Sequence, residues 1–360
     1  MPVSRRTSRP QTPGESGPSI LWESLDAAKF SSARSARCFP LMTDRILDFS
    51  NGPVKLSVRL EQLVIERPDL ETVTVPLGDI AAVCAAHPHV RYSQAVLAGL
   101  AAAGAVFVVC DRRQMPTAML LPLEGHCVQA ERFRQQTALA LPTRKRLWRQ
   151  LVQAKIRAQG RTLQALHGED AGLRQMAERV KLGDPDNLEA QASQRYWPLL
   201  FDDPGFRRKR DADDQNRSLN YGYGVLRALV ARALVAAGLH PTFGLHHSNR
   251  YNAFALADDL MEPYRPLVDQ AVASSVLEWG SKNLDQAGKA DVLDGLLGRF
   301  SFQNESRTLF DWLSRLTSCL VAVCSGDRRD LIVPELQPAQ EAPPKKSLGR
   351  VRDSAKEKAG

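Results

Sequence analysis

The hydrophobic and polar positions of this 360-residue chain change their spacing once, near residue 124. Before that point, short runs of alternating or β-branched residues are separated by turn sequences such as Asn51-Gly52-Pro53, a pattern typical of β-strands. The expected strands cover residues 45–49, 54–60, 62–66, 71–75, 80–84, 105–110 and 117–121. One helix is expected at about residues 93–103. The pattern therefore predicts a compact β-rich N-terminal domain.

From residue 126 onward, apolar residues recur at helical spacing and no further strand is expected. The expected helices cover residues 128–139, 144–166, 169–180, 185–200, 215–237, 251–277, 288–299 and 305–323. We therefore predict an α+β fold, with a β-rich domain at residues 42–123 followed by a larger all-α catalytic domain at residues 124–328. Residues 1–41 and 329–360 lack a periodic apolar pattern and are expected to be disordered extensions.

The overall composition is that of a globular protein, with 43% hydrophobic and 24% charged residues. No apolar run is long enough to span a bilayer, and the first residues lack the apolar core of a signal peptide. None of the six cysteines forms a CxxC pair, so no structural zinc is expected. We therefore expect a reduced, cytoplasmic protein that does not act at a membrane.

The basic surplus is concentrated in one segment. The whole chain has a formal net charge of +8, and residues 131–161 alone contain nine basic side chains opposed by one acid, Glu131. A solvated helix face normally interleaves acids with bases, so we interpret the segment as a surface for DNA phosphates, with plain solubility charge as the alternative. The candidate DNA contacts, including one from a later loop, are Arg132, Arg134, Arg144, Lys145, Arg146, Arg149, Lys155, Arg157 and Arg250.

A second unusual segment, residues 253–264, is almost entirely apolar except for the acids Asp258, Asp259 and Glu262. On a helix these acids fall within an arc of roughly 100°, where like charges raise one another's pKa unless a cation intervenes. No Lys or Arg lies one turn away, and Arg265 comes only after a proline. The missing counter-charge favours a metal site over the alternative, a solvated acidic stripe.

Two other segments contain residues of types that can bind a metal ion. His246 and His247 are adjacent, so at most one of them can face a metal from regular structure, and a packed histidine is the alternative. Asp184 is expected to cap a helix whose first residue is Pro185. Glu189 then lies in the second turn of that helix, where an ordinary surface role is the alternative.

Three motifs follow one another in the helical half: residues 187–193 (Asn-Leu-Glu-Ala-Gln-Ala-Ser) with Tyr196 and Trp197, then His247, then residues 259–263 (Asp-Leu-Met-Glu-Pro). In this order, behind a β-rich domain, they resemble the CRISPR-associated adaptation integrase, which inserts new spacers into CRISPR arrays in antiviral defence. The resemblance extends from about residue 44 to residue 323. Residues 257–268 look most like the branch that accompanies type II systems.

The resemblance implies a site and a reaction. The family's metal ligands fall on Glu189, His247 and Glu262, with His247 chosen over its neighbour by the family's spacing, and Asp259 matches an additional acid. Two carboxylates and one imidazole suit Mn²⁺ or Mg²⁺. The implied reaction is a metal-dependent transesterification, in which the 3′-hydroxyl of a protospacer attacks a phosphodiester at the repeat boundary. Tyr196 is expected to pack rather than to touch DNA.

The resemblance also implies partners. These are double-stranded DNA (protospacer and CRISPR repeat), a second copy in a homodimer, a small ferredoxin-like companion protein bound through the β-rich domain, and an RNA-guided effector nuclease. A metal-dependent nuclease that cuts branched or single-stranded DNA without joining it is the main alternative. An architectural DNA binder with an inert acidic site is the third hypothesis.

Overall fold

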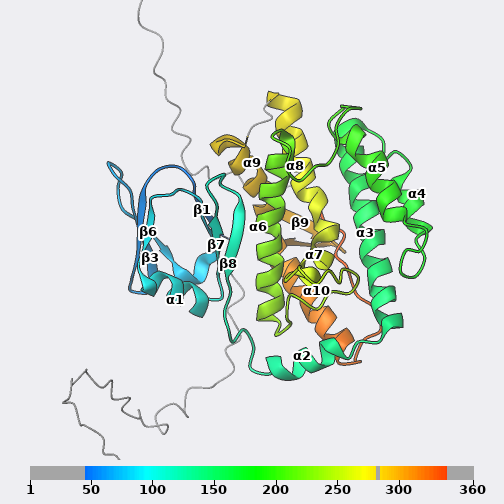
Figure 1. Ribbon diagram of the computed structural model, residues 1–360, viewed down its shortest axis with the longest axis horizontal. Coiled ribbons are helices and arrows are strands. Elements are labelled where there is room, and N and C mark those ends of the chain that lie inside the picture. Colours follow the sequence, from blue (N-terminus) through cyan, green and yellow to red (C-terminus); the bar gives the residue numbers. More distant parts are fainter. Residues whose placement is uncertain (1–44, 281–283, 339–360) are drawn as a thin grey trace, which may run out of the picture. The chain divides into compact units, whose positions relative to one another are not determined.

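The computed structural model describes residues 45–280 and 284–338, which belong to one compact unit. A β-rich region at residues 45–120 precedes a mostly helical region, so the predicted α+β class is confirmed (Figure 1). The predicted N-terminal extension, residues 1–41, lies outside the described residues.

The first β-sheet joins the β-rich region to the helices. In sheet order its strands are β1 (Arg45–Phe49), β5 (Ile80–Ala85), β7 (Val106–Cys110) and β8 (Pro116–Leu120). The first three are parallel and β8 is antiparallel to β7. Val106 and Val108 belong to the core shared with the helices, whereas Phe107 belongs to the core of the β-rich region. Burial on both faces explains why these strands are apolar at successive positions.

The second β-sheet encloses the smaller core. Its strands, in order, are β4 (Val73–Pro76), β3 (Gln62–Glu66), β2 (Val54–Arg59) and β6 (Val90–Tyr92). β6, which the sequence pattern did not predict, pairs in parallel with β2. Helix α1 (Gln94–Ala102) contributes Val96 and Leu100 to this core. The two sheets and α1 thus bury one continuous apolar cluster.

The helical region is built around α6. Its helices are α2 (Gln129–Thr137), α3 (Leu141–His167), α4 (Leu173–Glu178), α5 (Leu188–Leu200), α6 (Gln215–Ala236), α7 (Ala255–Met261), α8 (Arg265–Trp279), α9 (Gln286–Leu297) and α10 (Leu309–Cys324). Helix α6 contacts α7, α8, α9 and α10 as well as β5, β7 and β8. Because it is covered on several sides, it is apolar around most of its circumference. Helix α8 contacts both α6 and α3 and lies between them (Figure 1).

Two predictions for the helical region were wrong. The single helix predicted at residues 251–277 is divided into α7, the 3₁₀ turn η3 (Glu262–Tyr264) and α8. Pro263 has no N–H and clashes with the preceding turn, so it ends the regular α-helix at the acidic residues. Two strands, β9 (Arg299–Phe302) and β10 (Glu305–Thr308), also form a hairpin where only helix ends were expected.

The predicted tail beginning at residue 329 also starts too early. Leu331 and Leu336 are buried in the main core, and the short strand β11 (Gln337–Pro338) pairs with β9. Glu335 forms ion pairs with two arginines of α3. Residues 329–338 are therefore an integral part of the helical region, while residues 339–360 lie outside the described residues.

Within the described ranges, no helix is long and apolar enough to cross a membrane. The described cysteines are free thiols. Cys84 is buried in the core, and Cys110 is half-buried and packs against it.

Candidate metal centre

Glu189 is placed by a tight loop before α5. The helix begins at Leu188, later than predicted, because Asn187 adopts a left-handed conformation with φ of 51°. The carboxylate of Asp184 still caps the helix, accepting hydrogen bonds from the backbone N–H groups of Leu188 (2.9 Å) and Glu189 (3.0 Å). Glu189 therefore lies in the first turn rather than the second, with its side chain 24% exposed.

Glu262 lies against Glu189 although 73 positions separate them in the sequence. The ammonium group of Lys155, on α3, contacts both carboxylates: its Nζ is 2.6 Å from Glu189 Oε1 and 2.5 Å from Glu262 Oε2. Arg265 approaches the other oxygen of Glu262, with Nε 3.3 Å from Oε1. Four elements, α3, α5, η3 and α8, thus bring two acids and two bases to one place.

The buried cations keep Glu262 ionised. Burial by itself raises the pKa of this carboxyl, but the charges of Arg265 and Lys155 outweigh it and lower the pKa to about 2. For Lys155, burial lowers the pKa, yet Glu262 and Glu189 raise it above its ordinary value. Both partners are therefore charged at neutral pH.

His247 is held by the third acid of the cluster. The carboxylate of Asp259, which is fully buried, accepts hydrogen bonds from the backbone N–H groups of Leu245 (2.6 Å), His246 (2.9 Å) and His247 (3.3 Å). It also bonds Nδ1 of His247 at 2.5 Å. This hydrogen bond is the main cause of the raised pKa of His247, to which Glu262 and Glu189 also contribute. Asp259 therefore positions the imidazole, leaving its Nε2 atom for another partner.

The neighbouring histidine points elsewhere. His246 stacks on the ring of Trp148, with centroids 4.2 Å apart and planes at 3°. His247 meets the same ring edge-on. Both histidines thus contact Trp148, and His247 is the one whose Nδ1 also bonds Asp259.

The expectation that the acids lack counter-charges was wrong. Asp258 accepts two hydrogen bonds from Arg227 of α6, at 2.6 and 3.0 Å, and Glu262 is paired as described above. Arg265 is close because the 3₁₀ turn keeps residues three positions apart on one side despite the intervening proline. Arg227 and Lys155 come from other helices and could not be found from local spacing.

The cluster contains side chains that can bind a metal ion, but they are not arranged around one point in the structure. Among residues 45–280 and 284–338, no three His, Cys, Asp or Glu side chains already surround a common point. Glu262 Oε2 is buried, and the Lys155 ammonium contacts it at 2.5 Å. A single ammonium group between two carboxylates occupies a position in which a divalent ion would also be stable. The residues present therefore fit Mn²⁺ or Mg²⁺.

The basic segment is less free than its sequence indicated. Arg132 and Arg144 donate to backbone carbonyl groups, and Arg146 and Arg157 pair with acids distant in the sequence. Lys155, predicted to touch DNA, instead bridges the two carboxylates. Part of the positive charge in this segment is therefore paired with acids that fold against it.

Other predicted DNA contacts remain available. The side chains of Arg134 and Lys145 are exposed and make no hydrogen bond or ion pair within the described chain. Arg149 is half-buried, with its Nε atom lacking a hydrogen-bond partner there. Arg250 lies over the exposed ring of Tyr251, with the guanidinium carbon 5.0 Å from the ring centroid.

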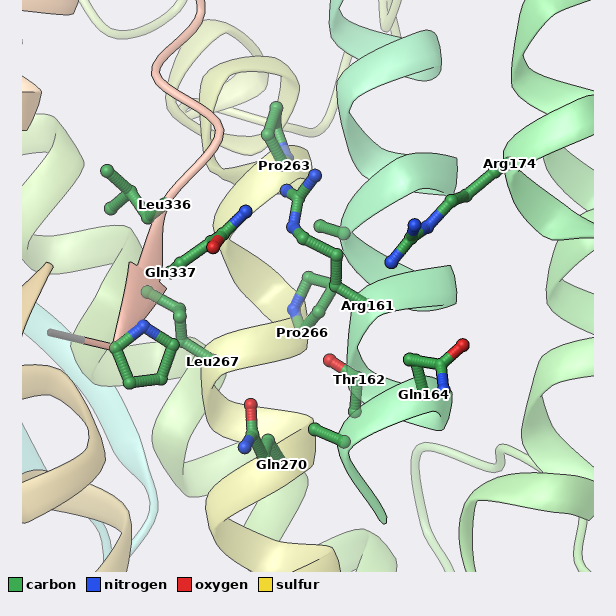
Figure 2. A pocket seen from close by; sticks show the side chains of 13 residues that line it. Arg161, Thr162, Gln164, Arg174, Pro263, Pro266, Leu267, Gln270, Leu336 and Gln337 are labelled. Atoms are coloured by element: carbon green, nitrogen blue, oxygen red, sulfur yellow. The ribbon is translucent and has the colours of Figure 1, made fainter. Parts of the chain in front are cut away.

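Two cavities flank the site. One, of about 350 Å³, is lined by His247 together with Arg144, Asn249 and Arg250 and opens beside the imidazole. The other, of about 280 Å³, lies between α3, α4, α8 and the C-terminal segment, and it contains no His, Cys, Asp or Glu side chain. Figure 2 shows its lining side chains, among them Arg161, Thr162, Pro266, Leu267, Leu336 and Gln337. Of these two cavities, the first is lined by one of the candidate ligands, His247.

Tyr196 is fully buried, in agreement with the expectation that it packs. Its hydroxyl group donates a 3.1 Å hydrogen bond to Asp269 on α8, and the hydroxyl group of Tyr223 donates to the same carboxylate. Burial raises the pKa of Asp269 to about 6. This network is a packed support beside the candidate metal centre.

Comparison with known proteins identifies the relatives of the chain. A family model described as "CRISPR associated protein Cas1" matches residues 50–285. A CRISPR-associated endonuclease Cas1 from Neisseria meningitidis serogroup C is 33% identical over 304 residues, covering 83% of this chain and 99% of the relative. A second relative of this name, from Pyrobaculum aerophilum, is 30% identical and covers 58% of this chain and 75% of its own length.

Solved structures share the fold at lower identity. A casposase bound to an integration product matches with a TM-score of 0.66 and 17% identity, over 80% of this chain and 92% of that one. A Cas1 protein from Thermotoga maritima matches with a TM-score of 0.61 and 15% identity, over 78% of this chain and 97% of that one. The family match and the full-length relative agree with the three motifs: the chain belongs to the CRISPR associated protein Cas1 family.

Proposed function

We propose that this protein is a metal-dependent DNA integrase that inserts protospacer DNA into a CRISPR array. The observation that carries the proposal is the convergence of Glu189 and Glu262 on one ammonium group, with His247 directed to the same cluster by Asp259. The relatives are named endonucleases, and the casposase with the similar fold was solved with an integration product. These names make DNA cutting and joining the activities to test here.

Glu189, His247 and Glu262 would hold the metal, His247 through its Nε2 atom. When bound, Mn²⁺ or Mg²⁺ would neutralise charge on the scissile phosphate and lower the pKa of the attacking hydroxyl. Asp259 fixes the imidazole by bonding Nδ1. Arg265 keeps Glu262 ionised.

The reaction exchanges one phosphodiester for another. The 3′-hydroxyl of the protospacer loses its proton to solvent and forms a new P–O bond, while the P–O bond to the repeat's 3′-oxygen breaks and that oxygen takes up a proton. No net phosphodiester energy is consumed, so ATP is not needed. Binding both strands in register is therefore the main task of the protein around the site.

DNA would approach through the cavity beside His247. Arg250 lies at this opening, and Arg134 and Lys145 add exposed positive charge near the start of α3. Such side chains hold phosphates without reading sequence. We also propose a homodimer, a small ferredoxin-like companion protein and an RNA-guided effector as partners, because the family resemblance implies them.

The test is a strand-transfer assay. The protein and its companion are mixed with a labelled short duplex and a supercoiled plasmid containing the repeat, in Mn²⁺ or Mg²⁺. The proposal predicts relaxed plasmid with the duplex covalently attached, and loss of this product with EDTA or in Glu189→Gln, His247→Ala and Glu262→Gln. Fragments without joined molecules would show the nuclease-only alternative. Joining that persists in all three variants would refute the assigned site.

A further inference from the structure

Lys155 is the residue that the sequence interpretation placed on the DNA surface and the structure places inside the site. Its side chain is 9% exposed, and its Nζ atom lies between Glu189 and Glu262. We propose that Lys155 is a built-in cation that holds these two carboxylates together without metal and is displaced when a divalent ion binds. This inference rests on the metal centre of the proposed function.

Charge explains why a cation must be present before the metal arrives. Glu189 and Glu262 belong to different helical segments, and two carboxylates brought together in a largely buried site repel one another strongly. The side chain of Glu262 is 7% exposed, so solvent cannot screen it. Lys155 removes this repulsion, allowing α3, α5 and η3 to pack together in the metal-free protein.

The contact geometry indicates that this cation is replaceable. The ammonium contacts Glu189 Oε1 at 2.6 Å and Glu262 Oε2 at 2.5 Å. One positive charge is therefore shared by two carboxylates, whereas a divalent ion would match the charge of both. The bonds of such an ion to oxygen are also not limited by the directions of N–H groups.

Arg265 is not equivalent to Lys155. Its guanidinium group lies over the ring of Tyr223, 4.3 Å from the centroid, and of the two acids bridged by Lys155 it pairs with Glu262. Lys155 bridges both acids and has a flexible four-carbon stem that can move its charge. Because Glu189 and His247 are 24% and 45% exposed, the site has an open side toward which an ammonium can move. Lys155 is therefore the cation that a metal displaces, whereas Arg265 stays.

The first test measures Mn²⁺ affinity by calorimetry or by the EPR signal of free Mn²⁺, without any DNA. Lys155→Met removes the competing charge and should bind Mn²⁺ at least tenfold more tightly than the unchanged protein. Lys155→Arg keeps a cation at the position and is the matched control, which should not gain affinity. Unchanged or weaker Mn²⁺ binding by folded Lys155→Met would overturn the inference.

The same titration separates this inference from the proposed function. If the unchanged protein binds Mn²⁺, Glu262→Gln does not, and Lys155→Met binds no more tightly, the metal centre stands and displacement is refuted. If neither the unchanged protein nor Lys155→Met shows saturable binding, the metal centre itself is refuted. Activity is not needed for either conclusion.

A second test uses the unchanged protein and so does not depend on a variant folding. The chain is treated with an amine-reactive reagent with and without saturating Mn²⁺, and modification of each lysine is measured by mass spectrometry. Lys289 is the internal control, because it is also buried and its Nζ bonds Gln114 away from the site. Modification of Lys155 should rise several-fold with Mn²⁺ while that of Lys289 stays constant. Equal protection of Lys155 in both conditions would contradict displacement.

Discussion

Glu262 and Asp269 are buried acids seven positions apart, and their surroundings give them opposite properties. Glu262 lies among the cations Arg265 and Lys155, which lower its pKa to about 2. Asp269 accepts hydrogen bonds from two tyrosine hydroxyls, and burial raises its pKa to about 6. Burial alone therefore does not define a metal ligand.

The comparison separates an open site from a closed one. Glu262 shares the Lys155 ammonium with Glu189, whose side chain is 24% exposed. The acid at position 269 is 1% exposed and already has two hydroxyl donors from Tyr196 and Tyr223. Its bonds are internal to the fold, which leaves nothing for a ligand to satisfy. We therefore assign function to the first acid and support to the second.

The largest expected difference is between Glu262→Gln and Asp269→Asn. Removing the charge of a metal ligand should lower Mn²⁺ affinity by more than about a hundredfold, because even groups behind a ligand are worth roughly 10- to 100-fold. Asp269→Asn should leave Mn²⁺ affinity within a few-fold of the unchanged protein. Metal titration of the two purified variants checks this, and equal losses in both would remove the distinction.

The two adjacent histidines extend the comparison. His247→Ala removes a ligand and should weaken Mn²⁺ binding by at least about tenfold, with loss of strand transfer. His246→Ala removes the stacking on Trp148, which contributes about 1 kcal/mol to stability, but should bind Mn²⁺ normally. Calorimetry and thermal unfolding distinguish these effects. A larger Mn²⁺ defect in His246→Ala would mean that the wrong histidine has been assigned.

Asp259→Asn should give an intermediate result. The residue touches His247 but is not expected to ligate, so its loss should weaken Mn²⁺ binding by roughly 10- to 100-fold without abolishing it. The variant also loses an acceptor of backbone N–H groups, which lowers stability. A Mn²⁺ titration carried to saturation gives the affinity of the variant, and its melting temperature gives the loss of stability. Binding as tight as in the unchanged protein would exclude the positioning role.

The smallest effect is a pH dependence of stability with opposite signs for the two acids. The pKa of Glu262 is lowered in the folded protein. The stability that this carboxylate contributes is therefore fully present at pH values above its ordinary pKa of 4.5, and it is lost as the pH falls toward 2. The folded pKa of Asp269 is raised, so the folded state retains a proton and stability falls as pH rises from about 4 to 6.

Urea unfolding at pH 4 and pH 7 isolates the effect of Asp269. Between these values the unchanged protein should lose about 1 to 3 kcal/mol relative to Asp269→Asn. The variant has no titrating group at this position and is the matched control. A relative change of the opposite sign would show that the carboxyl is stabilised in its charged form.

The sequence predicted those features that depend on neighbours along the chain. Period-two runs placed β2 and β3, a continuous apolar run placed β5, and helical spacing placed α3 and α6, because local apolar patterns record which faces are buried. The motif resemblance placed Glu189, His247 and Glu262 in one site. Their role as metal ligands remains a prediction for the titrations above.

The partners of these residues could not be predicted in the same way. Lys155 is 34 positions before Glu189, and Arg227 is 31 before Asp258, so the packing of α3 on α5 and of α6 on α7 brings each pair together. The position of Asp269 in the sequence does not show whether it is a metal ligand, because the tyrosines that donate hydrogen bonds to it come from α5 and α6. The 3₁₀ turn at Pro263 was not predicted, although it is the reason that Arg265 reaches Glu262.

The most direct test of the metal centre is an anomalous difference map from crystals of the protein grown with Mn²⁺. The account predicts a strong peak bounded by Glu189, Glu262 and Nε2 of His247, with the Lys155 ammonium moved away from both carboxylates. Crystals in which Mn²⁺ binds elsewhere, or in which Lys155 still bridges the acids at saturating Mn²⁺ with no peak beside them, would contradict it.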